Sequence, residues 1–228
     1  MDQNIRNKLL ALSEEKYKDF SQKLSPGAEE MLGVRLPNLR RLAKEIAKGN
    51  VQSYLAQDPG EYFEEIMLFG MVLGYADLSF GERWKEIEKF LPAVTNWSVC
   101  DSFCTGLPVS EGEREAVWEW LCSYTQREEE FHVRFAVVMM LLHYVDEAYL
   151  VQVLKKLDEI NHPGYYAKMA VAWAVCECYV KFPEVTEKYL LLSHLAPFTY
   201  NKAIQKILES RRVSPEQRER LRGMKKKS

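Results

Sequence analysis

Large aromatic residues return along this chain at a fixed interval, and that interval limits the folds open to it. Three successive spacings of 34 residues separate Phe63, Trp97, Phe131 and Tyr165. Each stands near the start of an apolar stretch with helical periodicity, whereas the alternation typical of a half-buried strand is nearly absent. A period in the thirties with two helices per unit is typical of α-solenoids, whose repeats bury their apolar faces only against neighbouring repeats.

The longest apolar stretches predict helices that are buried around most of their circumference. They cover residues 61–76, 133–145 and 165–180 and are rich in Met, Ala and Leu. More amphipathic helices are expected at 81–92 and 113–126. Pro and Gly breaks between these segments predict about a dozen helices joined by short turns.

We therefore expect an all-α fold, an α-solenoid of antiparallel helix pairs with a concave groove. It should form a single domain over residues 1–228, with a basic tail at about 213–228. The alternative is that helices of uniform length produce the recurrence by chance.

Polar residues follow the aromatic positions with nearly the same spacing. Intervals of 33, 34 and 34 residues separate Asp101, Arg134, Lys168 and Lys202. In a solenoid the second helices of successive pairs line one concave surface, so Asp101, Arg134 and Lys168 are expected to be neighbours there. A carboxylate that faces a groove beside a cation keeps its charge, whereas a buried and unpaired carboxylate is costly.

The net charge of −2 alone argues against a nucleic-acid-binding protein, but its distribution does not. Residues 1–50 hold ten Lys and Arg against seven Asp and Glu, and residues 199–228 hold ten against three. Residues 51–198 hold eleven against twenty-three. Basic ends around an acidic middle favour a polyanionic partner, although a Lys-rich tail is also typical of a solvated chain end.

Composition and cysteine usage indicate a cytoplasmic protein without a cofactor or a metal ion. No run of about 18 apolar residues is present, and MDQNIRNKLL carries charges where a signal peptide needs an apolar segment. An odd number of cysteines in apolar helical context is typical of buried thiols in a reducing compartment. No His stands at ligand spacing beside them. These cysteines are Cys100, Cys104, Cys122, Cys176 and Cys178.

Four segments together resemble the AlkD-like DNA alkylation repair proteins, which are built of HEAT-like helical repeats. The resemblance runs from about residue 15 to residue 212, with the four segments in the family's order. They are MLGVRLPNLRRLAKEI (31–46), NWSVCDSF (96–103), FHVRFAVVMML (131–141) and KMAVAWAVCE (168–177). The resemblance implies a HEAT-like solenoid and a monofunctional DNA glycosylase that hydrolyses the N-glycosidic bond of N3- or N7-alkylated purines.

The family site combines a Trp-x-x-x-Asp pair, an Arg in the next repeat and a Trp in the repeat after it. The resemblance implies these roles for Trp97, Asp101, Arg134 and Trp173. Asp101 would stabilise the oxocarbenium-like sugar, the two Trp side chains would pack on sugar and backbone, and Arg134 would hold a phosphate. The alternative is structural: the Trp side chains belong to the core, and Arg134 pairs with Asp101 as an exposed or buried bridge.

The expected partner is double-stranded DNA that contains alkylated bases, bound by a monomer. The resemblance also implies an N-terminal aromatic residue on the DNA-facing surface, for which Tyr17 and Phe20 are both candidates. Two other functions remain open, a non-catalytic DNA-binding module and a protein-interaction scaffold. The expected cationic contacts to DNA are Lys168, Lys202, Lys206, Arg211 and Arg212.

Overall fold

The computed structural model describes residues 3–226 of the chain, and over this range the fold is all-α, as predicted. The described residues form fourteen α-helices and two short 3-10 helices and contain no β-strand. The helices are α1 (Gln3–Ala11), α2 (Glu15–Leu24), α3 (Leu36–Ala47), α4 (Val51–Leu55), α5 (Phe63–Tyr75), α6 (Phe80–Phe90), η1 (Leu91–Ala93), α7 (Trp97–Gly106), η2 (Glu111–Glu113), α8 (Arg114–Tyr124), α9 (Glu130–His143), α10 (Leu150–Glu159), α11 (Tyr165–Lys181), α12 (Pro183–Leu192), α13 (Pro197–Glu209) and α14 (Pro215–Arg222). No helix in this range is both long and apolar enough to cross a membrane.

Two compact units divide the chain. The N-terminal unit spans Met1–Ser110 and the C-terminal unit spans Glu111–Ser228. Each unit has its own core and is described separately. The expectation of a single domain stays a prediction.

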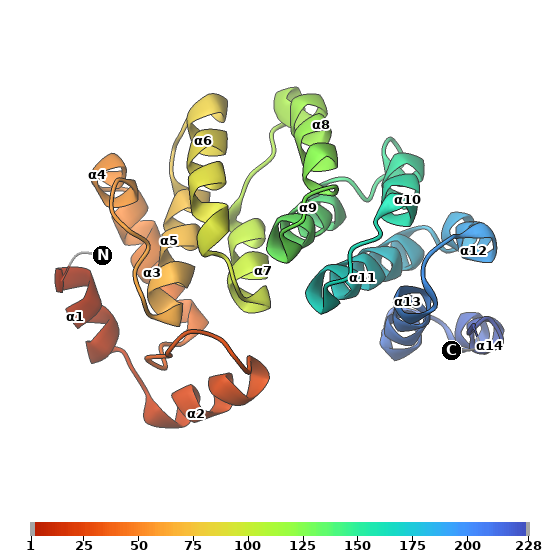
Figure 1. The fold of residues 1–228 in the computed structure, drawn as a ribbon, viewed down its shortest axis with the longest axis horizontal. Coiled ribbons are helices and arrows are strands. Elements are labelled where there is room, and N and C mark those ends of the chain that lie inside the picture. The colour runs from red at the N-terminus through yellow and green to blue at the C-terminus, as the bar shows by residue number, and fades with distance from the viewer. Residues whose placement is uncertain (1–2, 227–228) are drawn as a thin grey trace. The chain divides into compact units, whose positions relative to one another are not determined.

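The N-terminal unit is built of an inner row of helices with shorter helices packed on it. In the inner row α3 packs on α5, and α5 packs on α7 (Figure 1). α4 covers α3 and α5, and α6 covers α5. Inner and outer helices therefore alternate in sequence order in this unit.

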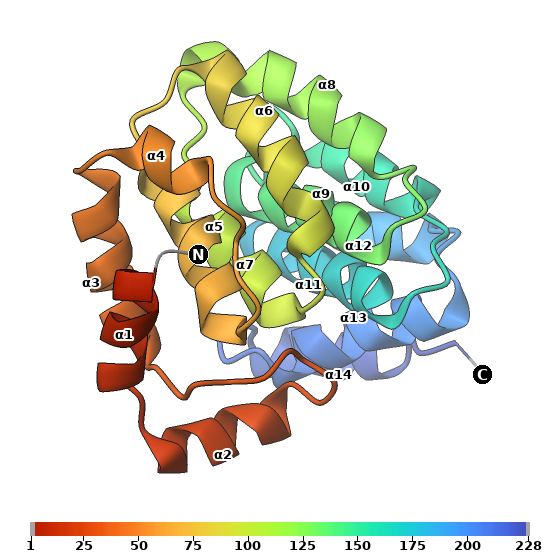
Figure 2. The same ribbon diagram turned by 60° about the vertical axis from the view of Figure 1, so that its left-hand side comes forward.

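The C-terminal unit repeats this arrangement. Its inner row runs α9, α11, α13, with each helix packed on the next (Figures 1 and 2). α8 covers α9, while α10 and α12 both pack on α11 and α14 packs on α13. A continuous solenoid with one concave groove across the whole chain stays a prediction.

The aromatic recurrence marks the starts of inner helices. Phe63, Trp97 and Tyr165 are the first residues of α5, α7 and α11, and Phe131 is the second residue of α9. The recurrence therefore has a structural cause in both units, because it follows the length of one helix pair.

The inner helices are covered on nearly all sides, as their apolar sequences predict. Every residue of α5 from Phe63 to Gly74 is buried. α5 and α7 approach each other closely at two glycines: a Cβ atom on Gly74 would lie 3.0 Å from the backbone carbonyl carbon of Gly106. The missing side chains therefore let α7, which carries Trp97 and Asp101, pack directly on α5.

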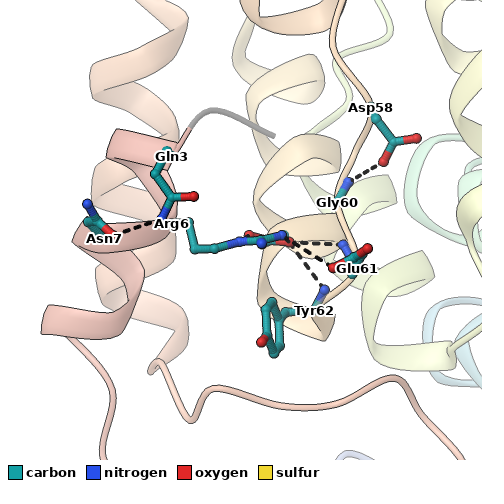
Figure 3. Close-up of polar contacts among 8 residues, drawn as sticks. Gln3, Arg6, Asn7, Asp58, Gly60, Glu61 and Tyr62 are labelled. Atoms are coloured by element: carbon teal, nitrogen blue, oxygen red, sulfur yellow. Dashed lines mark hydrogen bonds and ion pairs between the residues drawn. The ribbon is translucent and has the colours of Figure 1, made fainter.

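A buried carboxylate attaches α1 to the start of α5. Arg6 on α1 donates to both carboxylate oxygens of Glu65, at 2.6 and 3.0 Å, and Glu65 also accepts the backbone N–H groups of Glu61 and Tyr62 (Figure 3). Burial alone would raise the pKa of Glu65, but the bonds from Arg6 and the two backbone N–H groups hold it below its usual value. The Glu65 carboxylate thus accepts backbone N–H groups at the start of α5 and pairs with Arg6 at the same time.

The basic tail contains ordered structure. Ser214 and Gln217 cap α14, since each accepts the backbone N–H of the other. Leu221 on α14 is fully buried against the C-terminal unit. The expected basic tail therefore includes a capped helix, while Arg222, Gly223 and Lys225 after Leu221 are exposed. Residues 227–228 lie outside the described range.

Glu65→Gln should lower the free energy of unfolding by about 1.5–3 kcal/mol at neutral pH, because it removes charge-assisted hydrogen bonds to a buried carboxylate. The folded-state pKa of Glu65 is lowered, so its contribution is present above the ordinary Glu pKa of about 4.3 and is lost as the pH falls through the folded-state value. Urea unfolding at neutral and acid pH checks this.

Glu61→Gln is the matched control, because the exposed Glu61 side chain also faces Arg6, at 3.7 Å. This substitution should change stability by less than about 1 kcal/mol. Equal losses for the two variants, or a Glu65→Gln loss that does not shrink at acid pH, would contradict the assignment.

Candidate functional site

α7 carries Trp97 and Asp101 one helical turn apart. The helix begins after Asn96, whose side-chain oxygen accepts the backbone N–H of Ser98 at 2.8 Å. Trp97 and Asp101 lie at the edge of the core-facing side, and both are half-buried. The residues of α7 that are buried in the core are Val99, Cys100, Phe103 and Cys104. Asp101 is thus partly accessible on a helix otherwise anchored by apolar side chains.

A cavity of about 150 Å³ lies beside Trp97 in the N-terminal unit. Tyr17 from α2 and Phe63 from α5 line it together with Trp97. Phe20, the other candidate for the N-terminal aromatic, is exposed and does not line the cavity. The structure brings Tyr17 and Trp97 together, which favours Tyr17 for the expected role.

Tyr17 is held in place by a cation and an acid. The guanidinium of Arg35 lies 4.9 Å from the centre of the Tyr17 ring. Arg35 also donates to both carboxylate oxygens of Glu14, at 2.8 and 2.9 Å. This contact fixes α2 against the start of α3, so the cavity has one defined wall.

Glu64 also lines the cavity, but its oxygens are committed to the backbone. It is buried, and its carboxylate accepts three N–H groups at 2.7, 2.7 and 3.1 Å, from Leu32, Gly33 and Val34. Gly33 has a φ of +89°, and a Cβ atom there would lie 2.6 Å from the carbonyl oxygen of Glu14. Glu64 therefore stabilises this turn, and its carboxylate is fully used by backbone N–H groups.

Arg134 is buried, which corrects the expectation of an exposed groove residue. It is only 6% exposed on α9, and its Nη1 donates to the backbone carbonyl oxygen of Tyr166 at 2.9 Å. A buried guanidinium that binds a carbonyl contributes to the fold. We therefore expect substitution of Arg134 to lower the stability of the fold.

A second residue of α9 binds the same turn of α11. The Glu130 carboxylate accepts the backbone N–H groups of Tyr166 and Ala167, the latter at 3.2 Å. A Cβ atom on Gly164 would lie 2.5 Å from this carboxylate, so a larger residue there would displace the carboxylate from its present position. Glu130 and Arg134 are four residues apart on α9 and together fix the first turn of α11.

Trp173 is half-buried on α11 and belongs to a polar chain of contacts. Its indole N–H donates to the carboxylate of Glu177 at 3.3 Å. The same oxygen of Glu177 accepts from Nη2 of Arg212 at 2.6 Å. The indole orientation is thus fixed by an acid and a cation, which is not typical of a purely apolar core residue.

The cations expected to contact DNA all lie in the C-terminal unit and are accessible to different degrees. Lys168 on α11 and Lys202 and Lys206 on α13 are half-buried. Arg211 and Arg212 are exposed in the turn after α13, and Arg212 is paired with Glu177. Their clustering on α11 and α13 makes this the basic part of the unit.

Two residues near these positions escaped the sequence analysis. Glu177 follows Trp173 by four residues, a spacing that places both on one helical face. Phe198, the second residue of α13, follows Tyr165 by 33 residues and continues the aromatic recurrence. Both signals were present in the sequence.

The cysteines offer little reactivity. Burial raises the pKa of Cys176 to about 11 and that of Cys178 to about 12, so both thiols stay protonated at neutral pH. Within residues 3–226 no group of three or more His, Cys, Asp or Glu side chains is placed to hold a metal ion.

Asp101 and Arg134 were expected to be neighbours. They lie in different units, so this expectation stays a prediction. What each unit shows by itself is a half-buried acid one turn from Trp97, and a half-buried Trp173 linked through Glu177 to Arg212. A carboxylate beside an indole can stabilise a developing positive charge and orient a water molecule.

Arg134→Ala should lower the free energy of unfolding by at least about 2 kcal/mol, because it removes a buried charge-assisted hydrogen bond and leaves a cavity. Thermal or urea unfolding measures the effect. Arg211→Ala, which changes an exposed arginine of the same unit, should alter stability by less than about 0.5 kcal/mol. Equal stability of the wild type and Arg134→Ala would show that the hydrogen bond from Arg134 to Tyr166 contributes nothing to the stability of the fold.

The described geometry agrees with one comparison to known proteins. A family model described as "DNA alkylation repair enzyme" matches residues 5–207, most of the chain and both units. No curated protein matches the sequence significantly. The matched range contains the Trp97–Asp101 pair, Arg134 and Trp173, and the chain therefore belongs to the DNA alkylation repair enzyme family.

Proposed function

We propose that this protein is a monofunctional DNA glycosylase that removes N3- or N7-alkylated purines from double-stranded DNA. The observation that carries the proposal is the half-buried Asp101, one turn from Trp97 on α7, in a member of a DNA alkylation repair family. The protein acts as a cytoplasmic monomer in this proposal. No cofactor is required.

The chemistry needs only one carboxylate. Alkylation at N3 or N7 makes the purine cationic, so it leaves without a general acid. The C1′–N bond breaks, its electron pair neutralises the departing base, and positive charge develops on the sugar. Asp101 stabilises this charge and orients a water molecule. The water oxygen bonds to C1′, and its proton passes to Asp101 or to solvent.

The other site residues have positioning roles in this proposal. Trp97 and Trp173 pack on sugar and backbone and exclude bulk water around the reacting bond. Glu177 holds the indole of Trp173, as its hydrogen bond supports. Arg134 acts through the first turn of α11, because its guanidinium is buried and bound to Tyr166.

The phosphate contacts are assigned to the accessible cations of the C-terminal unit. Lys168, Lys202 and Lys206 present their ammonium groups along α11 and α13, and Arg211 extends from the following turn. Neutralising phosphates releases condensed counterions, so binding should weaken steeply as salt rises.

Asp101→Asn should reduce base release by about 100- to 1,000-fold, the effect of removing one group that stabilises transition-state charge. The measurement is release of free N7-methylguanine from methylated duplex DNA. Asp77→Asn changes an exposed acid of the same unit and should leave release unchanged. Undiminished release by a folded Asp101→Asn variant would refute the mechanism.

The double variant Lys206→Gln, Arg211→Gln should flatten the salt dependence of duplex binding, lowering the slope of log K against log salt by about 1.8 if two phosphate contacts are lost. Fluorescence anisotropy over a salt series measures this. Lys188→Gln, which removes one positive charge from the exposed face of α12, is the control and should keep the wild-type slope. An unchanged slope in the double variant would place the phosphate contacts elsewhere.

A non-catalytic DNA-binding module is the second candidate. It is favoured by the concentration of accessible cations on α11, α13 and the following turn. These cations belong to the C-terminal unit, whereas the α7 carboxylate belongs to the N-terminal unit. Salt-dependent duplex binding without any release of methylated base would select this function over the glycosylase.

A further inference from the structure

We propose that Tyr165, Phe198, Lys168 and Lys202 form a platform on which an unpaired nucleotide of single-stranded DNA stacks. These four residues are called the stacking platform. It is a binding site separate from the α7 carboxylate. The choice of DNA as the nucleic acid rests on the proposed function.

Two large aromatic side chains are unusually exposed at this place. Tyr165 is 54% exposed and Phe198 41%, and their ring centres are 6.1 Å apart. At the corresponding position of the recurrence in the N-terminal unit, Phe63 is buried. The aromatic residue that begins an inner helix thus serves the core in one case and faces solvent here. Adjacent exposed rings are typical of a surface that receives a ligand.

Cations flank the exposed ring of Phe198. The Nζ atoms of Lys168 and Lys202 lie 5.8 and 5.9 Å from the ring centre. Lys202 also donates to the side-chain oxygen of Gln205 at 3.2 Å, which holds it beside the ring. Within residues 3–226 neither lysine is within salt-bridge distance of a carboxylate, so their charge is available to phosphate.

A pocket of about 410 Å³ adjoins Phe198, within the range of about 300–1,000 Å³ typical of small-ligand sites. Its lining adds cationic and amide groups to the aromatic ring. The lining residues are Pro197, Phe198, Asn201, Lys202, Gln205, Lys225 and Lys226.

The wall of the pocket is fixed by hydrogen bonds. The Asn201 side chain accepts the backbone N–H of Lys226 and donates to its carbonyl oxygen, both at 2.9 Å. The Lys226 ammonium in turn donates to the carbonyl oxygens of Ser193 and Leu195, at 3.2 and 3.4 Å. A wall held in this way loses little conformational freedom when a ligand binds.

This combination favours an unpaired nucleotide over paired DNA. In a duplex the base faces are covered by their neighbours, so an aromatic ring can stack only on a base that is unpaired or at an end. Aromatic rings beside lysines are the common recognition elements for single strands, where the ring takes the base and the cations take the phosphates. Duplex binding would use the cations and leave the exposed rings without a role.

The test is fluorescence anisotropy of a labelled oligothymidylate of about twelve nucleotides with the full chain, a length within the usual site size. Phe198→Leu keeps an apolar side chain and removes the ring, so it should weaken binding by about 5- to 150-fold, the loss expected for one base–aromatic stack. Phe198→Tyr keeps the ring and should bind within about twofold of wild type. Circular dichroism and the melting temperature establish that the variants are folded.

Two further measurements separate the contribution of the aromatic ring to binding from that of the lysine charge. Lys202→Gln should weaken oligothymidylate binding and reduce its salt dependence, whereas Lys188→Gln should do neither. Against a fully paired duplex, Phe198→Leu should have much less effect than against oligothymidylate. Wild-type affinity of folded Phe198→Leu for oligothymidylate, an equal loss on duplex DNA, or no binding of oligothymidylate by the wild type would overturn the proposal.

The outcome is distinguishable from failure of the proposed function. Base release from methylated duplex is measured on the same preparations. If the wild type releases no base but binds oligothymidylate through Phe198, the glycosylase assignment fails and the stacking platform stands. If it releases base while Phe198→Leu binds oligothymidylate normally, the platform fails and the glycosylase assignment stands.

Discussion

The structure depends on inner helices whose apolar residues surround nearly the whole helix axis. α5, α9 and α11 cannot be stable on a surface, because each must be covered on several sides to remove its apolar area from water. Rows of inner helices with shorter covering helices satisfy this in each unit. The middles of these helices are core, so polar residues are placed nearer their ends. Asp101 and Arg134 both occupy the fifth position of their helices.

The same burial makes helix starts a problem, since their first backbone N–H groups lack partners within the helix. Carboxylates solve it here. Glu64 binds the turn before α3, Glu65 binds the turn before α5, and Glu130 binds the start of α11. Part of the acidity of residues 51–198 therefore stabilises backbone inside the fold. Glu64 and Glu65 are both buried, so they add little negative charge to the surface.

Acid chemistry and cationic contact belong to different units in the proposed function. The N-terminal unit supplies Asp101 and Trp97, with Tyr17 on the adjoining cavity, and the C-terminal unit supplies Trp173 and the cations. Arg134 is neither the acid nor one of the DNA-contacting cations in this proposal. It binds the first turn of α11, which carries Tyr165 and Lys168. A fold of repeated helix pairs allows this separation, because each repeat depends mainly on its neighbours.

The sequence by itself determined the all-α class, the positions of the long helices and the repeat interval, because helical periodicity and turn residues are local properties. Four matching segments also indicated the family and the candidates Trp97, Asp101, Arg134 and Trp173. Only the tertiary structure decided which candidates are accessible. It buried Arg134 against Tyr166, chose Tyr17 over Phe20 beside Trp97, and exposed Phe198. The reason is that periodicity fixes which residues share a helical face, whereas burial depends on which other helix covers that face, and that helix is distant in sequence.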